Sequence, residues 1–292
     1  MPDLAHVHAV LHCNVNTRDW EAVQEFFVPF GFTERMRNVS DDSDGAPLGL
    51  PKVTSSHVTF IYDKRGPRAA PALEIIEWLD PATEPLIPAP SGRYLGFAAV
   101  GLRVDDLTPF AHLGEEVEGG IEVRGRFRPA RRVQAPDNIV VELVQMPSGP
   151  DDRGVCHFSY LRLRSSGLKA TKNWYGLLGW RPVHESDGTL SLIVDEDPTV
   201  SLEFVFAPDA DPIAAHANTE GLYRMALAVE DVPAAVERLR AAGVQAPEPI
   251  FMPMLDVPTG GFTVAFLADP DGAVIEMVSR PRTEVRRPLL PA

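Results

Sequence analysis

Four stretches of the chain open with a strand of alternating side chains and then run into an acidic or polar turn. In each stretch one set of alternate side chains is aliphatic or small, as in Val100, Leu102 and Val104, while the other set is mixed or polar. One face of each strand is therefore expected to pack on a helix and the other to face a cavity. The four stretches are VLHCNVNTRDW from Val10, AAVGLRVDDL from Ala98, SYLRLRSSG from Ser159 and YRMALAVEDV from Tyr223.

Amphipathic segments that predict helices follow these strands. Three of them contain a glycine near the end, where the chain is expected to resume as strand: WEAVQEFFVPFGF, LKATKNWYGLLGW and PAAVERLRAAGV. A shorter helix is expected around PFAHLGEEV.

Every unit then ends in a hydrophobic strand with one repeated glutamate: Glu74, Glu142, Glu203 or Glu276. Two of these strands follow matching turns, PDN at 136 and PDG at 270, and the glutamate lies five residues after the turn aspartate in both. This coincidence indicates an internal duplication.

The predicted fold class is α+β, with four βαβββ modules in tandem that pair into two cup-shaped domains. Polar stretches rich in proline and glycine separate the modules, and the one at 146–154 is the expected domain boundary. The first domain is predicted at 1–150, with modules at 5–80 and 94–147. The second is predicted at 151–282, with modules at 154–207 and 221–280. The remaining residues, 283–292, are expected to form a flexible tail.

The composition narrows the class of partner. A formal charge of -14 would repel a phosphate backbone or an anionic membrane surface, so neither nucleic acid nor a membrane is an expected partner. No apolar run is long enough to span a bilayer, and the N-terminus lacks a basic region before an apolar core, so the expected location is the cytoplasm. Cys13 and Cys156 stand far apart, which argues against a disulfide framework or a zinc knuckle.

These features together resemble the vicinal oxygen chelate superfamily, which includes glyoxalase I, methylmalonyl-CoA epimerase, bleomycin resistance proteins and extradiol dioxygenases. The matching segments are FFVPFGF in the first module, WYGLLGW in the third, DPDGAVIEMV in the fourth, and the four strands with glutamate. The resemblance covers nearly the whole chain. It implies two glyoxalase-like domains, and it does not choose among the reactions that this fold supports.

The resemblance also implies where a metal would bind. In that family the ligands come from the start of each module's first strand and from the glutamate or glutamine of its last strand. With sequential pairing of the modules, the first cup offers His12, Glu74 and Glu142 as ligands, and the second cup has no histidine in a ligand position. If modules one and four pair instead, the set becomes His12, Glu74 and Glu276, with Arg224 nearby; the linkers favour sequential pairing.

The chemistry of these side chains supports a metal site independently of the family resemblance. One imidazole and two carboxylates could bind one divalent ion such as Zn, Fe, Mn, Ni, Co or Mg. Such an ion polarises a carbonyl and stabilises an enediolate, while Glu142 or Glu74 could act as general base. His12 could equally be a hydrogen-bonded core histidine. Glu77 lies on the same strand as Glu74 but on its opposite face, so only one of the two can point inward.

Further residues are candidates for catalysis or substrate binding. His57 could supply a fourth ligand or an acid–base group, or it could lie on a surface strand. Asn14 and Asn16 share the face of His12 and could bind substrate or satisfy nearby backbone. Another group, in the second cup, could bind a substrate anion or form internal ion pairs with the glutamates. That group is Tyr160, Arg162 and Arg224.

Three functions follow from these expectations. The first is a metal-dependent lyase or isomerase that acts on a small oxygenated metabolite. The second is a metal-free binding or resistance protein for an aromatic or antibiotic ligand. The third is a ring-cleaving oxygenase, which the absence of a second histidine ligand disfavours. In each the expected partner is a small molecule, and the chain is expected to be a monomer or a homodimer.

Overall fold

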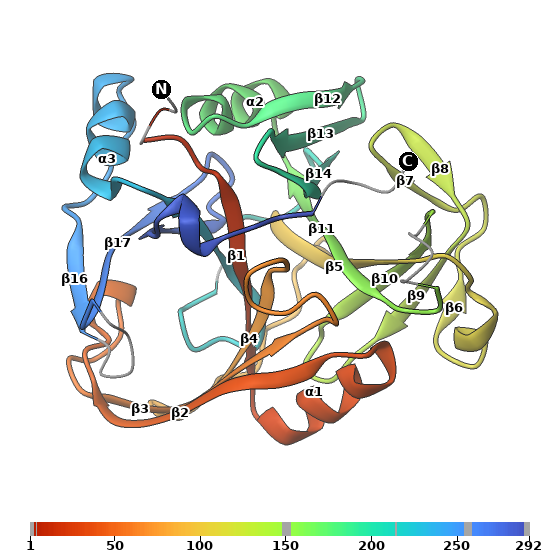
Figure 1. The fold of residues 1–292 in the computed structure, drawn as a ribbon, viewed down its shortest axis with the longest axis horizontal. Helices are drawn as coiled ribbons and strands as arrows, with labels where there is room; N and C mark the ends of the chain where they lie inside the picture. The colour runs from red at the N-terminus through yellow and green to blue at the C-terminus, as the bar shows by residue number, and fades with distance from the viewer. Residues whose placement is uncertain (1–2, 4, 148–152, 214, 254–258, 289–292) are drawn as a thin grey trace.

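The computed structural model describes residues 3, 5–147, 153–213, 215–253 and 259–288, which form a mixed α+β fold (Figure 1). Two curled eight-stranded sheets make up most of it. The strand order is β16-β17-β18-β15-β1-β4-β3-β2 in the first sheet and β12-β13-β14-β11-β5-β10-β9-β6 in the second, while β7 and β8 form a separate hairpin. The fold class is therefore the one that the sequence predicts.

The bounds of these elements follow the predicted modules closely. Strands of the first sheet are β1 (Ala9–Thr17), β2 (Thr33–Ser43), β3 (Thr54–Tyr62), β4 (Ala72–Asp80), β15 (Gly221–Val229), β16 (Ile250–Pro253), β17 (Gly261–Ala268) and β18 (Val274–Ser279). Strands of the second sheet are β5 (Gly96–Val104), β6 (Glu115–Glu116), β9 (Ala130–Gln134), β10 (Val140–Gln145), β11 (His157–Ser165), β12 (Arg181–Glu185), β13 (Thr189–Val194) and β14 (Asp197–Phe206). The hairpin consists of β7 (Ile121–Val123) and β8 (Arg126–Arg128), and the α-helices are α1 (Trp20–Phe27), α2 (Leu168–Leu177) and α3 (Val232–Ala241).

The acidic turns that follow two of the first strands start helices. Asp19 accepts a hydrogen bond from the backbone N–H of Ala22 at the beginning of α1, and Asp231 accepts one from Ala234 at the beginning of α3. These bonds satisfy backbone donors that have no partner within the helix. None of the helices in the described ranges is long and apolar enough to cross a membrane.

The second module lacks the α-helix that was expected around residues 109–117. Only a short 3₁₀ turn, Thr108–Phe110, forms there, and it buries Phe110. Gly114 then adopts a φ of +58°, and a Cβ at this position would lie 2.1 Å from the carbonyl oxygen of Arg132. The chain approaches β9 too closely for a helical turn to continue, and β6 pairs with β9 instead.

The modules do not pair in the sequential order that was expected. Strand β1 of the first module pairs antiparallel with β15 of the fourth, so one sheet contains modules one and four. Strand β5 of the second module pairs with β11 of the third, so the other sheet contains modules two and three. The expected boundary near residue 150 therefore lies between two modules of one sheet, and the prediction of sequential pairing was wrong.

The linkers follow this crossed arrangement. The segment after module one and the segment after module three run side by side, with bridges from Glu84 to Thr219 and from Tyr94 to Asp211. Each linker thus carries the chain from one sheet to the other. Their proline-rich composition correctly marks a break between modules, but composition carries no information about which sheet the chain enters next.

A carboxylate and an arginine from the first module hold the first strand of the third. Asp63, which directly follows β3, accepts a hydrogen bond from the backbone N–H of Phe158 at 2.9 Å. Arg65 donates to the carbonyl oxygen of the same residue at 2.7 Å and pairs with Asp63 at 2.7 Å. The backbone N–H and the carbonyl oxygen of Phe158 in β11 are therefore both satisfied by side chains that follow a strand of the other sheet.

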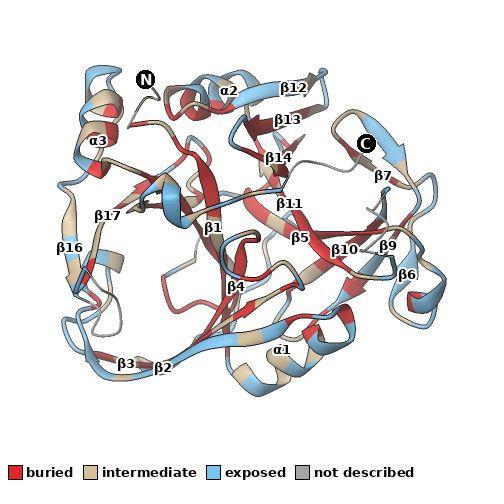
Figure 2. Cartoon of the chain, viewed as in Figure 1, coloured by how far each residue is buried: buried red, intermediate tan, exposed pale blue. Residues whose placement is uncertain are grey.

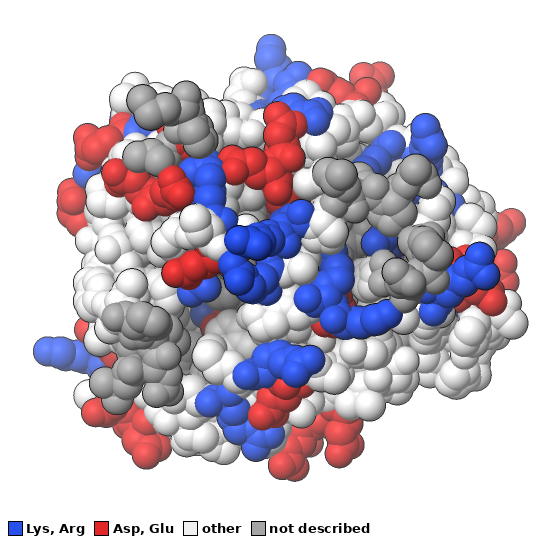
Figure 3. Space-filling view, viewed as in Figure 1, with Lys and Arg blue, Asp and Glu red and all other residues white. Residues whose placement is uncertain are grey.

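A second clamp of the same design holds the first strand of the first module. Asp197 accepts a hydrogen bond from the backbone N–H of Val10 at 3.2 Å, while Arg287 donates to the Val10 carbonyl oxygen. Arg287 comes from the C-terminal segment, which crosses the face seen in Figure 1, where basic side chains gather in Figure 3. Residues 283–288 are thus docked, contrary to the flexible tail that was predicted; residues 289–292 of that tail lie outside the described ones.

Apolar side chains lie on both faces of the two sheets, and Figure 2 shows the buried positions concentrated in the central strands. One large core includes helix-facing positions of both sheets, and the stacked rings of Phe30 and Phe110 join the first two modules within it. A smaller cluster around Ala226 and Val264 lies on the other face of the first sheet. A third cluster, around Tyr160, lies under the β7–β8 hairpin on the second sheet. The two concave faces are therefore filled differently.

Candidate functional site

Four charged or titratable side chains converge at the middle of the first sheet. His12, Glu74, Arg224 and Glu276 come from β1, β4, β15 and β18, which are four adjacent strands. The first module supplies His12 and Glu74, and the fourth supplies the other two. All four side chains are nearly buried, with exposed fractions between 7% and 12%. We call this group the charged centre.

Arg224 connects the two carboxylates of the charged centre. Its Nη2 donates to Glu74 Oε2 at 2.7 Å, and its Nε donates to Glu276 Oε2 at 2.9 Å. Burial alone would raise the pKa of Glu276, but Arg224 and His12 outweigh that effect and lower the pKa to about 2. The pKa of Arg224 is raised, because the two glutamates outweigh the cost of burying its charge.

Two polar atoms of the charged centre lack a hydrogen-bond partner among the described residues. His12 Nε2 lies 3.4 Å from Glu74 Oε2 and 3.6 Å from Glu276 Oε2, yet it makes no aligned hydrogen bond. Arg224 Nη1 is also buried without a partner. Buried polar groups are normally satisfied, so two such atoms from adjacent strands indicate a place where a ligand or water would bind.

Apolar side chains surround the charged centre. The ring of Phe60 meets the His12 ring edge to face at 5.4 Å between centroids, and Phe266 lies opposite Glu276 in the β17–β18 pair. Partly buried side chains from β1, β16 and β17 continue this apolar surface, and they are Leu11, Ile250, Met252 and Phe262. Charge in the middle and apolar walls around it are the composition that small-molecule sites in proteins favour.

A divalent ion does not fit the charged centre as it stands. The carboxylate oxygens that face His12 are the same Oε2 atoms that accept hydrogen bonds from Arg224. A guanidinium has no lone pair to offer a metal, and its positive charge opposes a second cation beside it. Within the described residues no cluster of three or more His, Cys, Asp or Glu side chains has an arrangement that could hold a metal.

Glu142 does not join His12 and Glu74, contrary to the predicted ligand set. It lies on β10 in the second sheet, where its Oε2 accepts hydrogen bonds from Tyr160 at 2.9 Å and from Arg162 at 2.7 Å. Burial would raise the pKa of Glu142, but Arg162 outweighs it and the pKa is lowered. The wrong assignment follows directly from the wrong module pairing.

The second sheet, which contains modules two and three, forms the second cup, and that cup is closed by its own side chains. Tyr160 is fully buried, and a Cβ at Gly101 would lie 2.2 Å from its ring, so the ring packs directly on the backbone of β5. Glu203 accepts hydrogen bonds from Ser191 and Ser201, and burial raises its pKa. Tyr160 and its neighbour Arg162, both predicted to bind substrate, are thus engaged by Glu142 inside the protein.

The remaining candidates have structural partners. Asn16 donates to the carbonyl oxygens of Ala217 and Thr219 and accepts from the Trp78 indole, so it fixes the second linker. Asn14 donates to the carbonyl oxygen of Glu74 at 3.4 Å, and its side-chain oxygen has no partner among the described residues.

His57 lies on the face of the first sheet that α1 covers. Its ring meets the Trp20 ring of α1 edge to face, and its Nδ1 lies 3.6 Å from Glu77 Oε2. Glu77 therefore shares the helix side with His57, while Glu74 lies in the charged centre. This position removes His57 from the set of side chains that could act together with His12.

Glu276 was missed in the main assignment, although the repeated glutamate of the last strands marks it. Only the alternative pairing of modules one and four brings it to His12.

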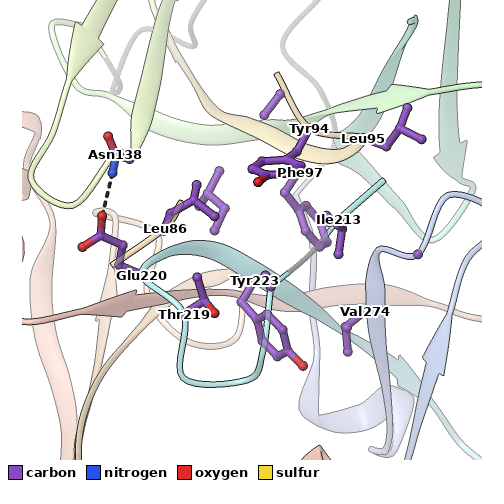
Figure 4. Close-up of a pocket in the computed structure, with 15 residues that line it drawn as sticks. Leu86, Tyr94, Leu95, Phe97, Asn138, Ile213, Thr219, Glu220, Tyr223 and Val274 are labelled. Atoms are coloured by element: carbon purple, nitrogen blue, oxygen red, sulfur yellow. Dashed lines mark hydrogen bonds between the residues drawn. The ribbon is translucent and has the colours of Figure 1, made fainter. Parts of the chain in front are cut away.

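A separate small cavity of about 80 Å³ lies where the two linkers meet, and it is lined mainly by apolar side chains (Figure 4). Asn138 donates to Glu220 at its edge. This cavity does not include the charged centre.

Comparisons with known proteins agree with this architecture. Residues 157–277 match the family model described as the Glyoxalase/Bleomycin resistance protein/Dioxygenase superfamily. Glyoxalase I from Zea mays is 18% identical, with 94% of this chain and 92% of that chain covered and a TM-score of 0.64. A putative dioxygenase from Bacillus subtilis is 12% identical, with 94% and 86% covered and a TM-score of 0.65. No curated protein matches the sequence. The resemblance found in the sequence is confirmed, and the two structures share the fold.

Proposed function

Residues 157–277 match the model of a superfamily in which one fold serves several activities, so we propose a function from the charged centre itself. We propose that the chain binds a small organic molecule on the concave face of the first sheet and does so without a metal ion. The observation that carries this proposal is a pair of buried atoms on adjacent strands, His12 Nε2 and Arg224 Nη1, that have no hydrogen-bond partner among the described residues.

The chemistry of the ligand follows from the two atoms and their surroundings. Arg224 Nη1 can only donate a hydrogen bond, so the ligand would present an oxygen or another acceptor to it. His12 can donate or accept, depending on its protonation. Phe60 and Phe266 would contact the apolar body of the ligand. A compound with an aromatic or aliphatic body and at least one carbonyl or hydroxyl oxygen meets these requirements.

A thermal-shift screen of such compounds, carried out with and without a chelator, tests the proposal. We expect a ligand that raises the melting temperature equally under both conditions. The variant His12→Ala should weaken binding of that ligand by about 10-fold, the effect of losing one ordinary hydrogen bond of about 1.4 kcal/mol. His57→Ala is the matched control, because His57 lies on the opposite face, and it should bind as the wild type does.

Two results would count against metal-free binding at the charged centre. One is a ligand whose stabilising effect disappears with the chelator. The other is equal loss of affinity in the His12 and His57 variants, which would place the ligand elsewhere. An isothermal titration of the two variants distinguishes these outcomes.

A second candidate function is the metal-dependent lyase or isomerase that the resemblance implies. The observation in its favour is that His12 Nε2 lies 3.4 Å from Glu74 Oε2 and 3.6 Å from Glu276 Oε2. It requires Arg224 to leave both carboxylates before one divalent ion, whether Zn, Fe, Mn, Ni, Co or Mg, could bind. Stoichiometric metal in the purified protein, together with chelator-sensitive turnover, would favour this candidate over the first.

The oxygenase alternative has less support. It depended on His57 as a second histidine ligand, and His57 lies on the helix-covered face beside Trp20. Oxygen uptake in the presence of a catechol is the measurement that would restore it.

A further inference from the structure

Arg224 occupies a place in the repeat that is equivalent to His12. Both lie near the start of a module's first strand, and the glutamate of each module's last strand lies beside it on a neighbouring parallel strand. Module one therefore contributes His12 with Glu74, and module four contributes Arg224 with Glu276. The charged centre consists of two equivalent pairs, which differ only in that one has an imidazole and the other a guanidinium.

We propose that the guanidinium of Arg224 is a built-in replacement for a metal ion, and that it alone keeps the other three side chains from binding one. This inference rests on the metal-free function proposed above and deepens it. It concerns a cation that belongs to the chain and therefore cannot be removed by a chelator.

The contacts of Arg224 support this role. Two buried carboxylates near one another repel, and each would be costly to bury without a positive partner. Arg224 donates one hydrogen bond to each of them, at 2.7 Å and 2.9 Å, from two different nitrogen atoms. It thus gives to both carboxylates the charge compensation and the fixed orientation that a shared cation would give.

The second sheet also pairs a buried glutamate with an arginine, at a different position of the strand. Arg162 lies two residues after Tyr160 on β11 and binds Glu142 at 2.7 Å. There the tyrosine takes the place that corresponds to His12, and the cup is filled. Both sheets therefore neutralise the glutamate of a last strand with an arginine from a first strand, and only the first sheet retains a histidine beside it.

Metal content after loading tests the inference directly. Wild type, Arg224→His and the double variant Arg224→His/His12→Ala would be incubated with zinc, nickel or manganese, freed of excess metal by gel filtration, and analysed by elemental mass spectrometry. We expect no stoichiometric metal in wild type, about one equivalent in Arg224→His, as for a site with two histidines and two carboxylates, and loss of that metal in the double variant. Circular dichroism verifies that each variant is folded.

Arg224→Gln serves as a second variant if the histidine variant does not fold without metal. It removes the positive charge and leaves His12, Glu74 and Glu276, so we expect a lower melting temperature than in wild type and a rise on addition of zinc. The matched control is Arg132→Gln, which removes a half-exposed arginine from Glu142 in the second sheet and should not respond to zinc.

Three results would overturn the inference. The first is stoichiometric metal in wild type that is lost in His12→Ala, because Arg224 would then coexist with an ion. The second is an Arg224→His variant that is folded but contains no metal after loading. The third is failure of zinc to bind or to stabilise either Arg224 variant, during refolding or afterwards. Ligand binding by wild type is measured independently, so a failure of the proposed function is distinguishable from these results.

Discussion

Arg287 and Asp197 form a fully buried ion pair with 2.9 Å between Nε and Oδ2, although 90 residues separate them in sequence. Neither side chain is more than 1% exposed. Asp197 also accepts from the backbone N–H of Val10, two residues before His12. The C-terminal segment therefore contributes to the position of the strand that carries the histidine of the charged centre.

We predict that Arg287→Ala lowers the free energy of unfolding by about 3 to 5 kcal/mol, because it leaves the Asp197 carboxylate buried without its cation. Arg286→Ala is the control: Arg286 is exposed and binds Arg68 through its backbone N–H alone, so the change should stay within about 0.5 kcal/mol. Urea unfolding followed by tryptophan fluorescence measures both. Equal stability of the two variants would contradict the buried pair.

The low pKa of Glu276 predicts a loss of stability in acid. Its pKa falls from 4.5 in the unfolded chain to about 2 in the folded protein, so the unfolded state binds the proton more tightly. The stabilisation is complete above pH 4.5 and is lost as the pH falls toward 2; for this single group it is on the order of 3 kcal/mol.

Unfolding experiments between pH 6 and pH 2.5 measure this effect. In Glu276→Gln we expect a smaller dependence of the unfolding free energy on pH over that window, because the titrating group is absent. The exposed carboxyl variant Glu237→Gln should keep the slope of wild type. An unchanged slope in Glu276→Gln would show that other carboxyl groups account for the acid sensitivity.

Gly101 and Tyr160 should behave as a coupled pair. In Gly101→Ala the new Cβ would lie 2.2 Å from the Tyr160 ring, so we expect a loss of about 1 to 3 kcal/mol from overpacking. In the Tyr160→Ala background the ring is gone, and the same change should have a smaller effect. A double-mutant cycle measures this coupling. Additive effects would mean that the ring does not pack on β5 as described.

The crossed pairing predicts how the chain behaves when it is divided. A fragment of residues 1–147 contains one module of each sheet, and so does a fragment of residues 153–292. Each fragment alone would expose the unpaired side of two central strands, so we expect neither to fold. Together they should form a one-to-one complex with the circular dichroism spectrum of the intact chain. Sequential pairing would instead let each fragment fold independently.

The module boundaries and the repeated glutamates could be predicted from the sequence because both depend on local patterns. Alternation along β1 determines that His12 and Cys13 face different environments, but it does not determine which strand pairs with β1. That choice is a long-range pairing, between β1 and β15, and the linkers that carry the chain between the sheets run beside each other at the bridge from Glu84 to Thr219. The sequence therefore predicted His12 and Glu74 together and assigned Glu142 where Glu276 belongs.

The role of the C-terminal segment could not be predicted for a similar reason. Proline and arginine are common in weakly ordered tails, and 283–292 has that composition. Whether Arg287 is solvated or buried depends on the buried carboxylate of Asp197 at the start of β14, far away in the sequence. Asp63 and Arg65 differ in this respect, because they lie two residues apart and their ion pair is local.

The presence of both sheets in one chain has a consequence for how the two cups can change over time. If two identical subunits formed this pair of sheets, every substitution would occur in both cups at once, and a tyrosine that filled one would fill the other. Here Tyr160 closes the second cup while His12 remains in the first. A single polypeptide thus lets one half serve as scaffold while the other remains free to acquire a ligand.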